Sequence, residues 1–269
     1  MTHFDYEEEA ASICKVRKFK VHCYLMRPLS SVGIVGGGLS GLSCAFHIKK
    51  LLPETHLVVY DYVTNTPTSR SMDENTASVA AAGLLHPFSP SGTLIWRGLE
   101  CFEETLSLVH LVEKTTGKKL YDRDIKIIRP ALEERDTFKL EKTASQYSKL
   151  CSYYDKDEGL LRYGSSVFIP AWRGVAQYES SLVLDPVSYL SSLWSTIVTL
   201  FDEVEWKNQK IDIQEVDKIK EIHDAVVFAG EYETNFSYIF VSLGRMASYN
   251  LLKYHDFRWC RNPRFLSLA

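Results

Sequence analysis

Three glycines with fixed spacing, Gly36, Gly38 and Gly41, carry the clearest chemical signal in this sequence. They follow an apolar run at 32–35 and precede a segment whose apolar residues recur with helical spacing. In the pattern G-x-G-x-x-G the first glycine permits a sharp turn, the second lets a pyrophosphate approach the backbone, and the third lets helix and strand pack closely. Phosphates would then meet unpaired N–H groups at the positive end of the helix dipole. The predicted pyrophosphate cradle is Gly36, Gly37, Gly38, Leu39, Ser40 and Gly41.

An acidic residue stands where a ribose would need it. A second apolar run, 57–60, ends in Asp61, which lies about 20 residues beyond Gly41. A carboxylate at this position can accept hydrogen bonds from both ribose hydroxyls, and it disfavours the 2′-phosphate of NADP. We therefore predict a dinucleotide site that includes Asp61 and the adjoining Tyr62. The motif alone leaves NAD and FAD open.

The elements that must position these residues can be outlined from periodicity and from helix signals. Asp185 and Pro186 are suited to the N-cap and first position of a helix, Gly117 is suited to a C-cap, and Pro130 is expected to end a strand. The predicted strands are 32–35, 57–60, 125–129, two or three within 164–184, 204–206, 210–213, 223–230 and 238–244. The predicted helices begin at Leu39 and then cover 94–115, 132–150 and 187–199. Strands alternating with helices predict an α/β fold.

Composition excludes several classes of protein. The chain has 269 residues, 45% hydrophobic and 24% charged, with a net charge of -3, which gives no electrostatic case for a nucleic-acid partner. Its six cysteines form no CxxC pair and no zinc pattern, so we expect reduced thiols and no metal site. No apolar run approaches the length of about 18 residues needed to span a membrane. We expect a soluble intracellular protein, either cytoplasmic or in the chloroplast. Residues 12–31 are basic and contain no acid, as in an organelle transit segment, but the acidic residues at 5–9 argue against one, so targeting stays open.

The stretch NTASVAAAGLLHPFSP, residues 75–90, resembles the second flavin segment of the D-amino acid oxidase superfamily. Members of that superfamily follow the acid-ended strand with a long loop and then an A-S-x-x-A-A-G-hydrophobic motif. The resemblance implies FAD as the cofactor. The residues that match the family's flavin-contacting positions are Ala77, Ser78, Gly83 and Leu84.

The resemblance extends from about 32 to 244 and implies a Rossmann-like FAD-binding domain with an interleaved, incomplete antiparallel-sheet substrate domain. Residues 84–98 resemble a plant and cyanobacterial branch of FAD-dependent oxidoreductases. By the same resemblance Ile211 would contact the adenine through its backbone, and Gly244 would end a strand beside the adenosine. The implied segments are an extension at 1–30, a discontinuous FAD-binding domain at 31–118 and 182–248, a partial substrate domain at 119–181 and an unrelated tail at 249–269.

The resemblance also implies a reaction, in which hydride passes to the flavin from the carbon beside an amine in a small-molecule amino acid or secondary amine. That scheme requires no protein base, so no catalytic residue is assigned. His86 is interpreted as a packing residue, and Trp96 and Arg97 as either flavin-edge or helix-start residues. Arg162 and Arg173 are candidate carboxylate ligands, although a surface position suits both.

Family members usually continue for about a hundred residues beyond the last matching strand, so we expect a C-terminally shortened chain. Two alternatives to an amine oxidase therefore stay open. One is a FAD-binding protein without turnover, and the other is a flavin domain that modifies a tRNA nucleoside. The balanced charge counts against the tRNA partner. Neither the substrate nor the oligomeric state follows from the sequence.

Overall fold

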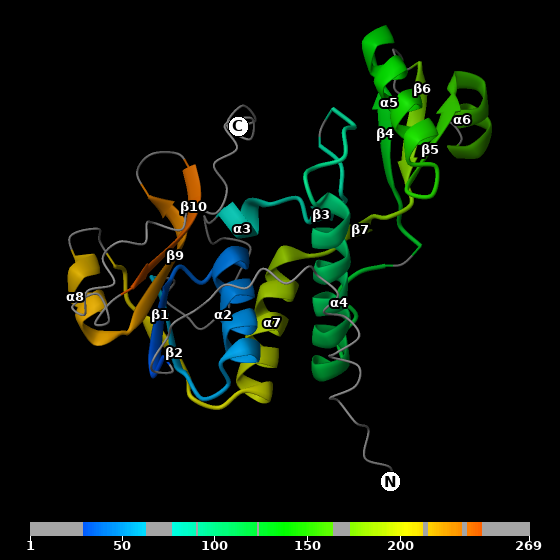
Figure 1. Cartoon of the computed structure of the whole chain (residues 1–269). Coiled ribbons are helices and arrows are strands. Elements are labelled where there is room, and N and C mark those ends of the chain that lie inside the picture. The colour runs from blue at the N-terminus through cyan, green and yellow to red at the C-terminus, as the bar shows by residue number, and fades with distance from the viewer. Residues whose placement is uncertain are drawn as a thin grey trace.

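The structure, a computed structural model, describes residues 29–62, 77–89, 91–122, 124–163, 173–211, 215–232 and 236–243. Elements alternate between strand and helix over most of this length, and all of them are shown in Figure 1. The strands are β1 Ser31–Val35, β2 His56–Asp61, β3 Leu84–Leu85, β4 Ile127–Ala131, β5 Cys151–Asp155, β6 Gly174–Tyr178, β7 Leu182–Val183, β8 Val204–Asn208, β9 Ala225–Tyr232 and β10 Phe236–Leu243. The helices are α2 Leu39–Leu51, α3 Ala77–Ala80, α4 Gly98–Thr116, α5 Glu134–Gln146, α6 Lys156–Tyr163, α7 Pro186–Leu200 and α8 Val216–Ile222.

A five-stranded sheet in the order β10-β9-β1-β2-β8 forms the larger part of the fold. β1 lies at its centre and pairs in parallel with β2 and β9, while β10 joins β9 in the antiparallel sense. Both faces of the central strands are buried, which explains their nearly continuous apolar sequence. The expected α/β class is confirmed.

Helices cover this sheet on both faces. α2 and α7 lie on one face, α4 packs on the outer side of α7, and α8 lies on the other face (Figure 1). The main core between the sheet and α2, α4 and α7 includes Ile34, Leu42, Val59, Leu190 and Ile197, all fully buried. The helices α2, α4 and α7 begin at the same end of this layer, beside the carboxyl ends of β1 and β2 (Figure 1).

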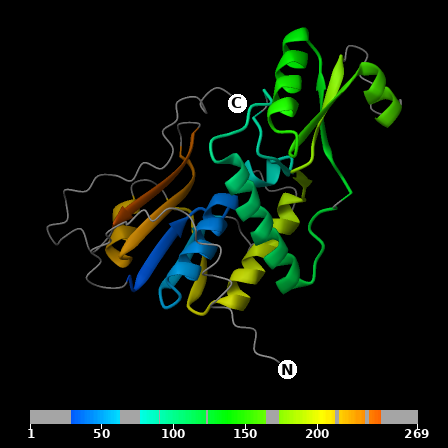
Figure 2. The ribbon, with the colours of Figure 1, turned by 45° about the vertical axis from the view of Figure 1, so that its right-hand side comes forward.

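A smaller antiparallel sheet, in the order β4-β6-β5, stands apart from the larger one (Figures 1 and 2). α5 packs across it and its core contains Phe88, Leu140 and Tyr178. The two-stranded ribbon of β3 and β7 lies where the chain passes between the two sheets. Residues 86–89 and 91–97, which follow β3, therefore lie against the small sheet and lead to the start of α4.

Several predicted boundaries are wrong. β4 continues through Pro130, which pairs with Val175; proline is tolerated because β4 is an edge strand bonded only to β6. α4 begins at Gly98 rather than four residues earlier, and Trp96 is 71% exposed instead of packing on the helix face. Residues 210 and 211 form no strand. Sequence periodicity also missed β5, α6 and α8, which are elements of five to eight residues, too short to show a clear period.

Candidate functional site

The glycine turn joins β1 to α2 as the sequence predicts. Gly36 has φ +104°, a conformation that side chains rarely adopt, and its N–H donates to the Tyr60 carbonyl at 2.8 Å. A Cβ on Gly41 would lie 1.7 Å from the Gly36 carbonyl oxygen, so the helix can only pack this closely without one. The glycines at both ends of the motif are therefore required by the backbone itself.

The first turn of α2 leaves backbone donors available. The N-cap residue Gly38 supplies no side-chain cap, and α2 has no acidic residue in its first turn. Within the part of the chain that the structure describes, the N–H groups of Gly38, Ser40 and Gly41 donate to no acceptor. Unpaired donors at a helix N-terminus, with no anionic side chain to compete, form a site for phosphate oxygens.

Asp61 closes the turn from the end of β2. Its Oδ2 accepts a hydrogen bond from the Gly37 N–H at 3.0 Å, and its Oδ1 accepts one from the Tyr62 N–H at 2.8 Å. Asp61 is 9% exposed, whereas Tyr62 is 57% exposed. The indole of Trp206 lies over Gly37, where a Cβ would come within 2.1 Å of its Cη2 atom. Sequence reasoning missed Trp206, because only the pairing of β8 with β2 brings it to the turn.

The segment predicted as the second flavin contact does reach the glycine turn. The Ser78 hydroxyl oxygen accepts a hydrogen bond from the Leu39 N–H at 3.0 Å, and a Cβ on Gly38 would lie 2.7 Å from the same oxygen. Ala77 and Ser78 are in the short helix α3, which contacts α7. Ser78, 39 positions beyond Leu39, thus caps the N-terminus of α2, a role for which Gly38 has no side chain.

Gly83 and Leu84 continue this segment towards the small sheet. Gly83 has φ +68°, and a Cβ there would lie 1.8 Å from the Leu184 carbonyl oxygen. Leu84 pairs with Val183 and is 52% exposed, so its side chain is open to a ligand. The next residues return to α7, where Asp185 accepts hydrogen bonds from two backbone N–H groups as the predicted N-cap.

His86 lies in the loop that joins the two sheets. Its ring stacks on Tyr178 with centroids 4.8 Å apart, and Phe88 stacks on the same tyrosine at 4.9 Å. Burial lowers the pKa of His86, and the charge of Arg129 lowers it further. Burial raises the pKa of Tyr178 to about 12. The structure thus places His86 in packing contact, as the sequence analysis interpreted it.

The remaining candidates fall into two groups. Ile211 is buried in a core cluster with Val35 and Tyr60, the residues that precede Gly36 and Asp61, and its backbone contact with the adenine stays a prediction. Arg162 and Arg173 are exposed, and the guanidinium of Arg162 lies 4.6 Å from the ring centre of Tyr154. Gly244 lies outside the described residues, so the strand end predicted beside the adenosine has no structural account here.

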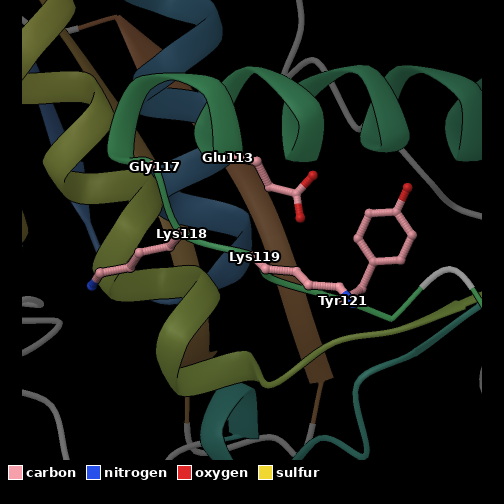
Figure 3. Close-up of a pocket in the computed structure, with 5 residues that line it drawn as sticks. All are labelled: Glu113, Gly117, Lys118, Lys119 and Tyr121. Carbon is pink, nitrogen blue, oxygen red and sulfur yellow. The ribbon is translucent and has the colours of Figure 1, made fainter.

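A pocket at the C-terminal end of α4 lies far from the glycine turn (Figure 3). Its lining includes Glu113 and Tyr121, which serve local structure: Glu113 accepts from the Leu120 N–H at 2.9 Å, and the Tyr121 hydroxyl is 2.8 Å from Nε2 of His110. The αL conformation of Gly117 ends the helix here, as predicted. Since α4 extends for 19 residues, or about 28 Å, this pocket is separate from the site at the helix starts.

Among the described residues, no three or more His, Cys, Asp and Glu side chains gather as they would around a metal ion. No helix in the described ranges has both the length and the apolar character required to cross a membrane.

The chain matches no protein-family model and no curated protein. Among solved structures it is similar to the glycine oxidase from Geobacillus kaustophilus, at 18% identity and a TM-score of 0.51, over 66% of this chain and 46% of that one. The glycine oxidase from Bacillus cereus is similar at 17% identity and a TM-score of 0.50, over 80% of this chain and 52% of that one. This chain therefore spans about half the length of these two proteins. The comparisons confirm the expected α/β fold, which this chain shares with the matched parts of these two glycine oxidases.

Proposed function

We propose that this chain binds FAD and belongs to an oxidoreductase that acts on the C–N bond of an amino acid or secondary amine. The observation that carries the proposal is the turn at Gly36–Gly41, where three backbone donors have no acceptor among the described residues and Asp61 lies beside them. The fold shared with two glycine oxidases supports the same class of reaction.

The residues present fit the cofactor. The N–H groups of Gly38, Ser40 and Gly41 would hold the pyrophosphate, because no described residue accepts from them and they lie at the positive end of α2. Asp61 would hold the ribose hydroxyls, because its carboxylate lies at the end of β2 beside the glycine turn and can accept hydrogen bonds from both. A side chain on Gly38 would fill the space that the phosphates need, since its Cβ would already touch Ser78.

The segment from Ala77 to Leu84 would extend the site away from the ribose. Ser78 contacts the start of α2, and the exposed Leu84 lies beside the start of α7 and the small sheet. Bound here, FAD supplies the hydride acceptor that no side chain can provide. The protein would hold the dinucleotide from the glycine turn past Ser78 towards Leu84, and the amine substrate would bind near Leu84.

A visible spectrum of the purified chain after addition of FAD tests the proposal directly. A perturbed flavin spectrum that bleaches with an amine under anaerobic conditions is expected. Retained flavin that no amine bleaches would favour the alternative of cofactor binding without turnover. If the chain retains no flavin, both assignments are wrong.

The Gly38→Val variant locates the cofactor. Its branched side chain would occupy the place of the pyrophosphate, so binding of FAD should be lost while the fold survives. Gly117→Ala is the matched control: its φ of +69° strains an alanine, and it lies at the far end of α4, so it reports a destabilising glycine substitution remote from the turn. Equal FAD affinity in Gly38→Val and wild type would contradict the cradle.

A further inference from the structure

The pocket at the C-terminal end of α4 has a volume of about 330 Å³ and lies where the chain turns back after the helix (Figure 3). It is lined by Glu113, Gly117, Lys118, Lys119 and Tyr121. A hollow of this size is at the lower end of the range for sites that bind small molecules. The proposed function gives the pocket no role, because the glycine turn lies near the other end of α4.

The wall of the pocket opposite α4 is the segment 117–121, which is held at both ends. Gly117, in the αL conformation, ends the helix, and its N–H donates to a carbonyl of the preceding turn at 2.8 Å. Leu120 is buried in the main core. The Tyr121 hydroxyl lies 2.8 Å from Nε2 of His110, which belongs to α4. The shape of the pocket is therefore built into the fold.

One side of the pocket carries negative charge. Glu113 is partly buried, and its Oε1 accepts a hydrogen bond from the Leu120 N–H at 2.9 Å, which holds the carboxylate in place. A carboxylate can accept several hydrogen bonds at once. The last carbonyl groups of α4 add the partial negative charge of the helix dipole. This side therefore favours an ammonium group and disfavours an anion.

The other side carries positive charge. Lys119 is exposed, its side chain extends towards Tyr121, and its Nζ lies 3.5 Å from Oδ1 of Asp122 (Figure 3). An ammonium has three donors, so Lys119 can bind a second carboxylate while it keeps this ion pair. Lys118 extends in the opposite direction (Figure 3). This side therefore favours a carboxylate and disfavours a cation.

We propose that this pocket binds a small zwitterion, an α-amino acid with an apolar side chain. Its ammonium donates to Glu113, its carboxylate accepts from Lys119, and its side chain lies against the ring of Tyr121. A ligand with both charges satisfies both sides of the pocket, whereas a simple anion meets Glu113 and a simple cation meets the lysines. Since α4 is about 28 Å long, this site is separate from the proposed FAD and amine sites, and binding needs no flavin.

Calorimetric titration of the whole chain with L-leucine tests the site without flavin. Leucine should bind. Leucinamide lacks the carboxylate and 4-methylpentanoate lacks the ammonium, so each should bind at least about tenfold more weakly, the scale of one lost hydrogen bond between charged groups. If leucine does not bind, or if all three compounds bind equally, the proposal is overturned.

Two variants each remove one charge from the pocket. Glu113→Gln keeps an oxygen that can accept from the Leu120 N–H, and Lys119→Met keeps most of the side chain, so both should remain folded in urea titrations. Each should weaken leucine binding at least about tenfold. The matched controls Glu103→Gln and Lys114→Met remove the same charges at exposed positions of α4 outside the lining, and they should leave the affinity unchanged. Equal weakening in the controls, or none in the pocket variants, contradicts the site.

Amide NMR spectra locate the bound leucine. Saturating leucine should shift the amide resonances of Gly117 and Leu120 and leave that of Leu84 in place. Shifts confined to Leu84 and its neighbours would put leucine at the amine site of the proposed function and refute a second site. If no amine bleaches the flavin while leucine still shifts Leu120, the proposed function fails and this site stands.

Discussion

Replacing Asp61 with asparagine separates the two tasks assigned to this carboxylate. One oxygen accepts from the Gly37 N–H at 3.0 Å and the other from the Tyr62 N–H at 2.8 Å. Asparagine keeps a single acceptor oxygen, so its amide group must face one of the two N–H donors. A nearly buried side chain cannot turn to water to relieve this contact.

The expected magnitude follows from the lost bond. A hydrogen bond to a charged group contributes about 1.5–3 kcal/mol, and Asp61→Asn should lower the free energy of unfolding by that amount. For a chain of this size the midpoint of thermal unfolding should fall by roughly 3–12 °C. Loss of the anion beside the ribose should weaken FAD binding by about 1–3 kcal/mol, or roughly 5- to 150-fold.

The assay pairs urea unfolding with titration of flavin fluorescence. Asp224→Asn is the matched control, because Oδ2 of Asp224 accepts from the N–H groups of Ser30 and Ser31 at the opposite end of the same sheet. That variant should bind FAD as wild type does. If Asp61→Asn binds FAD with unchanged affinity, Asp61 does not hold the ribose.

Three further outcomes are expected. Gly41→Ala should lower the free energy of unfolding by at least about 2 kcal/mol in urea, since its Cβ would lie 1.7 Å from the Gly36 carbonyl oxygen and cannot be accommodated without moving backbone. Asp185→Ala should cost about 0.5–2 kcal/mol at pH 7 through loss of the N-cap. The Ser188 hydroxyl, and then the backbone N–H groups of α7, hold the pKa of Asp185 in the folded state below its ordinary value. The difference in unfolding free energy between wild type and Asp185→Ala should therefore shrink as the pH falls below about 4. A difference that does not depend on pH would contradict the cap. Burial, and then a nearby carboxylate, raises the pKa of Cys151 to about 11, so a thiol reagent at pH 8 should label the exposed Cys101 and spare Cys151 until urea is added, as mass spectrometry of the labelled peptides would show.

The sequence by itself determined the βαβ unit and its phosphate-binding turn. Gly36 needs a positive φ, Gly41 needs close packing, and Asp61 follows from the end of a strand; these are local requirements that leave a fixed spacing in the chain. Gly117 and Asp185 were predictable as helix caps for the same reason. For the glycines and the caps the residues that interact are near one another in sequence, whereas Asp61 reaches Gly37 across the regular spacing of the βαβ unit.

Only the tertiary structure decided which distant residues complete these local features. Ser78 caps α2 and Trp206 covers Gly37 because a loop and a strand pairing bring them there, and neither contact has a sequence period. Pro130 could be kept within a strand because its strand became an edge. Burial decided the rest: the stacking of His86 and Phe88 on Tyr178 is a property of packing rather than of the order of residues.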